Sequence, residues 1–202
     1  MRCSLSYACK TSSHSENYPE KVVLGLSFTV ICNDGVEKAR LDTQEANLRM
    51  DPEKHHSISM YEITVKNESD SRVLPSAVKI SCYKDGNVTS SKTVPFHYPP
   101  RAGNPPISVV KKADERPAFC GTTRVECQVQ AHPAARFQLL ESDCLGTCKK
   151  YVKVKLNTTC IRHEKDSNRA EFYMDLKADK QITCNASNAE GFLLSKYKRY
   201  KG

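Results

Sequence analysis

The sequence predicts an all-β chain of two β-sandwiches in tandem, and three observations support this fold class. Apolar side chains occupy every second position in several segments, which is the period of a half-buried strand. Two pairs of cysteines, Cys32 with Cys82 and Cys127 with Cys184, lie about 50 residues apart on the apolar side of such segments. A further strand-like segment precedes the second cysteine of each pair. The two halves of the chain therefore look like one fold used twice.

The first half contains three segments with this alternation, namely Leu24–Cys32, Tyr61–Val65 and Val78–Cys82. After the last of them, the step from Asp85 to Gly86 predicts a hairpin turn. We expect the last strand of this half to run from Val88 to Phe96. Residues 33–56 are polar and poor in β-branched side chains. The pattern assigns no strands there and leaves helical or irregular structure open.

A proline-rich segment separates the halves. Four prolines fall within the nine residues from Tyr98 to Pro106, which predicts a short, stiff linker. We expect a first domain over residues 1–101, a linker over 102–107 and a second domain over 108–202. The strands predicted in the second domain lie around Ser108, Thr123, Phe137, Tyr151, Phe172, Ile182 and Phe192. Strands of this number and length suit a sandwich.

Neither half has many apolar residues from which to build a core. Hydrophobic residues make up 39% of the chain and aromatic residues 7%, and tryptophan is absent. A disulfide that closes a loop of about 50 residues adds roughly 4 kcal/mol in the chain-entropy model. The chain contains ten cysteines, an even number that fits five disulfides formed in an oxidising compartment.

Six cysteines remain beyond the two core pairs, and they are Cys3, Cys9, Cys120, Cys144, Cys148 and Cys160. Proximity along the chain favours a bridge between the first two. The other four belong to the second domain, where two arrangements stay open. Either Cys144 pairs with Cys148 and Cys120 with Cys160, or the pairs are crossed. The residues alone do not choose between these connectivities.

Asn-x-Ser/Thr sequons predict N-linked glycans at Asn67, Asn87, Asn157 and Asn185. Asn157 lies on the polar side of the alternating segment 152–156, and Asn185 is out of phase with Cys184, so we expect both to face solvent. No stretch is long and apolar enough to cross a membrane, and no signal-like segment follows Met1. We expect an extracellular chain, either secreted or part of the ectodomain of a membrane protein.

Two motifs in the second half carry a resemblance to a known family. Residues Cys184–Gly191 read C-N-A-S-N-A-E-G and resemble the C-x-A-x-N-x-x-G stretch of intermediate-set immunoglobulin domains. Residues Cys127–Pro133 resemble the C-x-V-x-A-x-P strand and bend of the same domains. The resemblance implies an immunoglobulin-like second domain, whereas the first domain is supported by its cysteine spacing and alternation.

The sequence also departs from that family pattern. The core tryptophan that such domains place after the first cysteine is replaced by Leu139 or Phe137. The tyrosine two residues before the second cysteine is Ile80 in one half and Ile182 in the other. The tyrosine-corner hydrogen bond of these domains therefore cannot form.

A second resemblance covers about a sixth of the chain. Residues Cys82–Arg101 and Cys127–Leu140 look similar to secreted two-immunoglobulin insulin-binding proteins of invertebrates. This resemblance implies a trap for insulin-like or other growth-factor peptides. The broader expectation is an extracellular recognition module, such as a receptor or adhesion ectodomain, that binds a protein ligand through exposed aromatic and arginine anchors. Our candidate anchors are Tyr98, Arg101, Tyr197, Arg199 and Tyr200.

The net charge of +8 leaves a second class of partner open. The basic residues form two clusters, Lys149, Lys150, Lys153 and Lys155, and later Lys196 and Lys198 with their neighbours. Such clusters are either ordinary solvated surface or a binding site for heparan sulfate in the extracellular matrix. No nucleic-acid motif accompanies them, so we expect no nucleic acid and no membrane insertion in this segment.

The sequence gives no support for catalysis or metal binding. It contains no Gly-x-Ser-x-Gly elbow, no His-Glu-x-x-His pair and no glycine-rich phosphate loop. His55 and His56 are adjacent, and the other histidines stand alone, whereas a zinc site needs ligands at finger-like spacing. We therefore predict a protein that is not an enzyme and that carries no metal and no cofactor.

Overall fold

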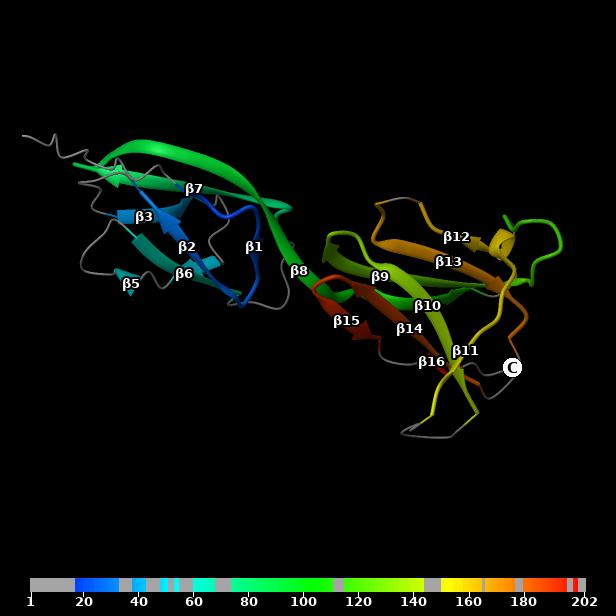
Figure 1. The fold of residues 1–202 in the computed structure, drawn as a ribbon. Coiled ribbons are helices and arrows are strands. Elements are labelled where there is room, and N and C mark those ends of the chain that lie inside the picture. Colours follow the sequence, from blue (N-terminus) through cyan, green and yellow to red (C-terminus); the bar gives the residue numbers. More distant parts are fainter. Residues whose placement is uncertain are drawn as a thin grey trace, which may run out of the picture. The chain divides into compact units, whose positions relative to one another are not determined.

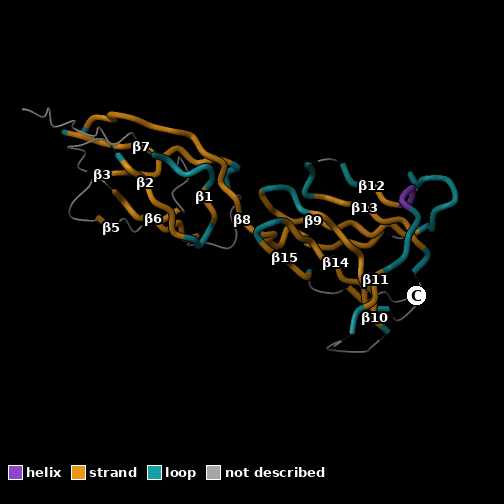
Figure 2. Tube along the Cα trace, viewed as in Figure 1, coloured by secondary structure: helices purple, strands orange, loops and turns teal. Residues whose placement is uncertain are grey.

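The computed structural model describes residues 17–32, 38–42, 48–50, 53–54, 60–67, 74–110, 115–143, 150–164, 166–176, 180–195 and 198–199. The chain divides into two compact units, Met1–Phe96 and His97–Gly202 (Figure 1). Nearly all the regular structure that is described is strand, and the one helical turn among the described residues is η1 (Thr158–Cys160), as Figure 2 shows. The predicted all-β fold class is confirmed.

The first unit contains two sheets. One sheet has the order β2-β6-β4, with β5 also paired to β6; these strands are β2 (Ser27–Ile31), β4 (Leu48–Met50), β5 (Glu53–Lys54) and β6 (Met60–Asn67). The other sheet joins β3 (Lys38–Asp42), β7 (Ala77–Lys84) and the first part of β8 (Asn87–Val110), and β1 (Val22–Val23) pairs with β8. The disulfide between Cys32, directly after β2, and Cys82 on β7 connects the two sheets.

The core of the first unit follows the predicted alternation along β7. Val78, Ile80 and Cys82 are buried, and so are Val94 and Phe96 on β8. The predicted hairpin is confirmed, since Lys84 pairs with Asn87 and the two residues between them have φ angles of 51° and 78°. Two consecutive positive φ angles define the tight turn that matches the twist of the strands it joins.

Two details of the first unit differ from the sequence prediction. The strand expected from Leu24 begins only at Ser27, because Gly25 has a φ of 80° and Leu26 N–H donates to Val23 O in a turn. Leu26 is 60% exposed as a result. Residues 33–56, which the pattern left unassigned, contribute the short strands β3, β4 and β5.

Strand β8 passes through the proline-rich segment instead of ending before it. It pairs with β7 up to Pro95, and from Tyr98 to Val110 it pairs with β9 of the second unit. The register shifts between Tyr98 and Arg101 and between Ala102 and Ile107, the two places that contain the prolines. A proline lacks the N–H that a ladder needs, so pairing is interrupted locally without ending the strand. The linker expected over 102–107 lies within β8, and the compact units divide after Phe96.

The second unit consists of two antiparallel sheets. One has the order β12-β13-β9-β8, with β9 (Thr123–His132), β12 (Ile161–Arg162) and β13 (Arg169–Met174). The other has the order β11-β10-β14-β15, with β10 (Arg136–Ser142), β11 (Val152–Lys153), β14 (Gln181–Asn188) and β15 (Gly191–Leu194), and β16 (Lys198–Arg199) pairs with β14. The disulfide between Cys127 on β9 and Cys184 on β14 crosses from sheet to sheet.

The core of the second unit surrounds this disulfide. Leu139 lies directly opposite Cys184 and is buried in the same cluster. Of the two candidates, Leu139 and Phe137, it is therefore Leu139 that takes the position of the usual core tryptophan. Ile182, which stands where such domains carry a tyrosine, is fully buried in this core. This arrangement has the topology of an immunoglobulin domain. Four strands form one sheet, the remaining strands of the unit form the facing sheet, and one disulfide joins the central strands β9 and β14. The chain folds as two immunoglobulin-like sandwiches in tandem.

Candidate functional site

The expected anchor Tyr98 is not a surface residue. It is only 5% exposed, its ring packs at 6.5 Å from the ring of His132, and its carbonyl oxygen accepts a hydrogen bond of 2.9 Å from Asn188 Nδ2. Tyr98 is therefore buried in this structure, and its role as a ligand anchor stays a prediction. Arg101 is half-buried on β8. The backbone of Arg199 lies in β16, and Tyr197 and Tyr200 fall outside the described residues.

Asn188 organises one end of the second sandwich. Its Nδ2 donates to the carbonyl oxygens of both Tyr98 and Pro133, at 2.9 Å each, and its Oδ1 accepts from Glu190 N–H at 3.0 Å. One side chain thereby connects β8, the bend after β9, where the His132–Pro133 peptide is cis, and the turn between β14 and β15. The sequence motif contained this asparagine, although sequence reasoning gave it no role.

Two histidines lie beside this asparagine. His97 Nδ1 is 3.0 Å from Glu190 Oε1, and the rings of His97 and His132 meet edge to face with centroids 5.3 Å apart. Burial lowers the pKa of His132, and the neighbouring His97 lowers it further. These groups hold the end of the sandwich together, and the stability of this end consequently depends on pH.

A groove of about 640 Å³ lies at the opposite end of the second sandwich. Its walls come from the loop before β9, from β11 and the segment after it, and from the end of β13. The lining includes Phe119, Glu141, Val152, Lys153, Lys155, Asn157, Tyr173 and Asp175, so the sequon at Asn157 lies in this groove. We call this feature the groove site.

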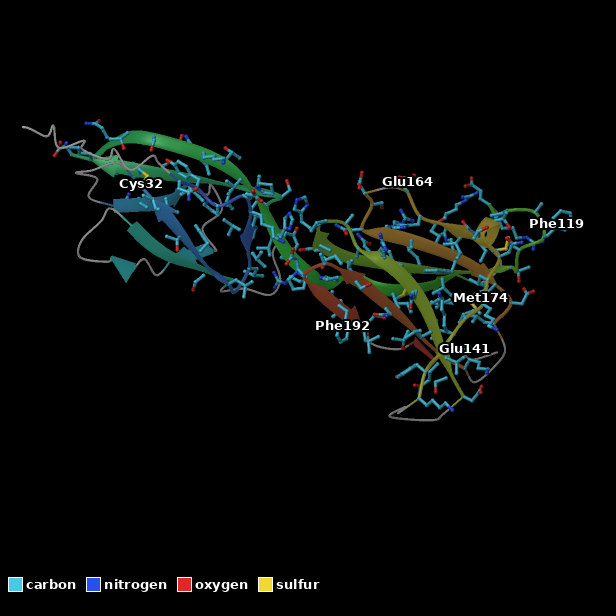
Figure 3. All side chains as sticks on the ribbon, viewed as in Figure 1. Cys32, Phe119, Glu141, Glu164, Met174 and Phe192 are labelled. Atoms are coloured by element: carbon cyan, nitrogen blue, oxygen red, sulfur yellow. A yellow bond between two sulfur atoms is a disulfide. The ribbon has the colours of Figure 1, made fainter. Side chains whose placement is uncertain are left out.

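Phe119 is fully exposed at the rim of the groove site, at the tip of its loop in Figure 3. Its φ angle is 64°, a conformation that a bulky aromatic residue rarely adopts. A turn fixes this conformation, because Cys120 N–H donates to Pro117 O at 3.2 Å and Arg116 Nη1 donates to Cys120 O at 2.6 Å. The disulfide between Cys120 and Cys160 then attaches the loop to η1. Strain of this kind is concentrated at functional sites.

The floor beneath this loop is rigid. Tyr173 is buried against the Cys120–Cys160 disulfide and donates its hydroxyl to Glu171 Oε2 at 2.8 Å. Burial raises the pKa of Tyr173, and the hydrogen bond to Glu171 raises it further. Gly121 passes so close to Met174 that a Cβ there would overlap its backbone. The loop therefore presents Phe119 on a fixed support.

The Cys120–Cys160 bridge chooses one of the two arrangements that the sequence left open, in which Cys144 would pair with Cys148. Cys3, Cys9, Cys144 and Cys148 lie outside the described residues. No three histidine, cysteine, aspartate or glutamate side chains gather as metal ligands in the part of the chain that the structure describes. In the same part, no helix is long and apolar enough to span a bilayer.

The outer face of strands β9 and β13 carries charged pairs. Arg169 contacts Glu126 at 2.9 Å and Glu171 at 3.0 Å, and Arg124 lies 3.6 Å from Glu171. Alternating charges of this kind are typical of a solvated surface, and each exposed pair contributes little to stability. This face offers no apolar anchor among the described residues.

Lys153 and Lys198, one described member of each lysine cluster, lie on strands at one end of the same sheet. Lys198 pairs with Ile182, Ile182 with Glu141, and Glu141 with Val152, the neighbour of Lys153. Three strand spacings separate the two edges, about 14 Å. The side chains of Lys150, Lys153 and Lys155 are exposed. Lys149 and Lys196 lie outside the described residues.

The sequons occupy different settings. Asn67 ends β6, Asn87 is exposed at the start of β8, and Asn185 is half-buried on β14. Asn157 is exposed, but the strand expected over 152–156 ends at Lys153. Asn157 instead caps η1, because its Oδ1 accepts from Thr159 N–H at 3.2 Å.

Several solved structures of tandem immunoglobulin domains are similar to this chain. A three-domain fragment of titin is 15% identical, with 89% of this chain and 61% of that one covered and a TM-score of 0.35. Mouse nectin-like molecule 4 is 15% identical over 92% of this chain and 62% of its own, with a TM-score of 0.35. The two-domain module of the Drosophila receptor protein tyrosine phosphatase DLAR is 11% identical over 88% and 91%, with a TM-score of 0.25.

This chain thus spans less than two thirds of the titin and nectin-like chains. No protein-family model and no curated protein matches the sequence. The order of the strands and the two disulfides between sheets define the immunoglobulin-like fold of this chain.

Proposed function

We propose that this chain is an extracellular protein-recognition module whose ligand binds at the groove site. The observation that carries the proposal is Phe119, a fully exposed aromatic residue held in a strained conformation at the rim of a groove of about 640 Å³. Exposed aromatic residues on rigid supports are the anchors from which protein interfaces draw most of their binding energy. Because the support is fixed before binding, little conformational entropy is lost in the complex.

The extracellular assignment rests on the covalent chemistry of the chain. Three disulfides, Cys32–Cys82, Cys120–Cys160 and Cys127–Cys184, are formed within the described residues. Disulfides of this density form and persist in oxidising compartments, and the four sequons belong to the same compartment. The chain acts there either as a secreted protein or as part of a cell-surface receptor or adhesion ectodomain.

The groove site also indicates the chemistry of its ligand. Phe119 and Val152 supply exposed apolar surface. Beside it, Lys153 and Lys155 place positive charge, and Glu141 and Asp175 place negative charge. A protein surface that combines an apolar pocket with charges of both signs would complement this arrangement. Binding here requires that Asn157, which also lines the groove, carries no glycan, and mass spectrometry of the glycopeptides measures this.

The test is capture of proteins from extracellular fluid by three immobilised forms of the chain, followed by mass spectrometry. The forms are the natural chain, Phe119→Ser, and Phe192→Ser as a matched control at another exposed phenylalanine of the same domain. We expect the natural chain and the Phe192 variant to capture the same protein and the Phe119 variant to lose it. Equal capture by the Phe119 variant, with an unchanged circular dichroism spectrum, would refute the groove site.

A secreted trap for insulin-like or other growth-factor peptides is the more specific form of this function. A trap binds its soluble hormone as a monomer and with high affinity. Titration calorimetry with an insulin-like peptide distinguishes it from an adhesion fragment. One-to-one binding that Phe119→Ser abolishes supports the trap, whereas no heat of binding excludes an insulin-like ligand and leaves the wider function in place.

Binding of heparan sulfate is a second candidate, supported by the register that brings both lysine clusters to one end of a sheet. Chromatography on heparin tests it with the variant Lys153→Gln/Lys155→Gln. A dedicated site keeps the natural chain bound well above physiological salt, and the double variant elutes earlier because two sulfate contacts are lost. Elution of both forms near physiological salt would show that the lysines are ordinary surface.

A further inference from the structure

Strand β15 carries an exposed apolar strip on the outer face of the second sandwich. Phe192, labelled in Figure 3, is 71% exposed. Leu194 is 47% exposed, whereas Leu193 between them packs against the core. Large apolar side chains that adjoin one another on a protein surface indicate that something covers them. The neighbouring strand β14 carries a residue that could anchor such a cover.

The sequon Asn185-Ala186-Ser187 on β14 lies beside the apolar strip on β15. Asn185 lies directly opposite Leu194, and Ser187, the acceptor serine of the same sequon, lies directly opposite Phe192. Side chains at directly opposite positions on one face of an antiparallel pair are in contact distance, with Cβ atoms about 5 Å apart. A glycan on Asn185 thus starts between the two exposed apolar residues of the strip and the neighbouring strand β10.

The side chain of Asn185 lies on the outer face of its sheet. Its neighbours Cys184 and Ala186 are buried in the core, so the side chain of Asn185 belongs to the outer face. Its Oδ1 is buried and has no hydrogen-bond partner within the described structure.

We propose that an N-linked glycan on Asn185 covers the apolar strip of Phe192 and Leu194. The first N-acetylglucosamine has an apolar ring face that packs on Phe192, and its hydroxyls keep the outer surface hydrated. The glycan removes the strip from water and denies this face to protein partners. The proposal shares only the extracellular compartment with the proposed function, and the groove site lies at the other end of the domain's strands.

The experiment uses the full chain secreted from eukaryotic cells. Mass spectrometry of the glycopeptides measures occupancy at Asn185 and at Asn87. The variant Ser187→Ala removes the glycan without changing the asparagine, Asn87→Gln is the control at another exposed sequon, and Ser187→Ala/Phe192→Ser/Leu194→Ser removes the glycan and the strip together. Binding of the dye ANS measures exposed apolar surface, and sedimentation measures self-association.

We expect an occupied Asn185, several-fold greater ANS fluorescence and concentration-dependent self-association for Ser187→Ala, and natural behaviour for the control and the triple variant. If Ser187→Ala is not secreted, enzymatic removal of the glycans from the folded natural chain gives the same two readings. An unmodified Asn185 together with a glycan on Asn87 would overturn this proposal and leave the proposed function untouched. The same holds if Ser187→Ala stays monomeric and binds no more ANS than the natural chain. Dimerisation of an unmodified natural chain through Phe192 also overturns it, and absence of glycans at every sequon contradicts the compartment as well.

Discussion

The buried disulfide of the second domain allows a quantitative test of the fold. Replacement of Cys127 and Cys184 by alanine opens a loop with a sequence separation of 57 residues. The chain-entropy model assigns a loop of this length about 4 kcal/mol. Both sulfurs lie in the core, so each loss of one buried heavy atom adds about 1 kcal/mol in lost packing. The total, about 6 kcal/mol, is comparable with the whole stability of a domain of this size.

The matched control is the double variant Cys120→Ala/Cys160→Ala. Its loop separation of 40 residues gives almost the same entropic loss, about 4 kcal/mol, but the bridge lies in a small cluster beside the groove site. Cys120 and Cys160 are buried too, but in a cluster of three residues, so less packing is lost there than in the larger cluster around Cys127 and Cys184. Urea unfolding followed by circular dichroism should therefore show a transition of the second domain that moves farther for the core variant, by about 1 kcal/mol. An equal or reversed order would refute the assignment of Cys127 and Cys184 to the packed centre.

Three further predictions concern single residues. Phe119→Gly should stabilise the second domain by about 1 kcal/mol, measured by urea unfolding, because glycine tolerates the φ angle of 64°; a loss of stability would contradict the strain. Asn188→Ala should destabilise the domain by about 3 kcal/mol in the same assay, because two carbonyl oxygens lose their donor. The folded pKa of His132 lies below its ordinary 6.5, so the unfolded chain binds the proton more readily; thermal unfolding should show stability falling as pH drops from 7.5 to 5.5, and His132→Gln should lessen the fall.

The alternation of apolar residues predicted the cores because it depends only on the two-residue period of a strand. Every second residue of β9, from Thr123 to Ala131, is buried, as the alternation in the sequence predicts. The Asp85-Gly86 hairpin was equally local, since its φ angles are set by the two residues themselves. The cysteine spacing added the long-range information that placed two sheets face to face.

The functional surface depends on contacts that local pattern does not contain. Tyr98 is buried beside His132, and its carbonyl oxygen accepts from Asn188, 90 positions later. Phe119 became a candidate only with the Cys120–Cys160 bridge, which the sequence left as one of two arrangements. The proline-rich segment was predicted to be a linker, yet β9 pairs with it through register shifts. Each of these features is determined by a partner distant in sequence.

The most direct measurement of the recognition function is site-specific photo-crosslinking in extracellular fluid. A photoreactive phenylalanine analogue would replace either Phe119 at the groove site or Phe192 on β15, the two large exposed aromatic side chains of the second domain among the described residues. We predict a covalent adduct with a separate protein at position 119 and none at position 192. Adducts at position 192 alone would contradict the groove site and place recognition on the face that we assign to the glycan.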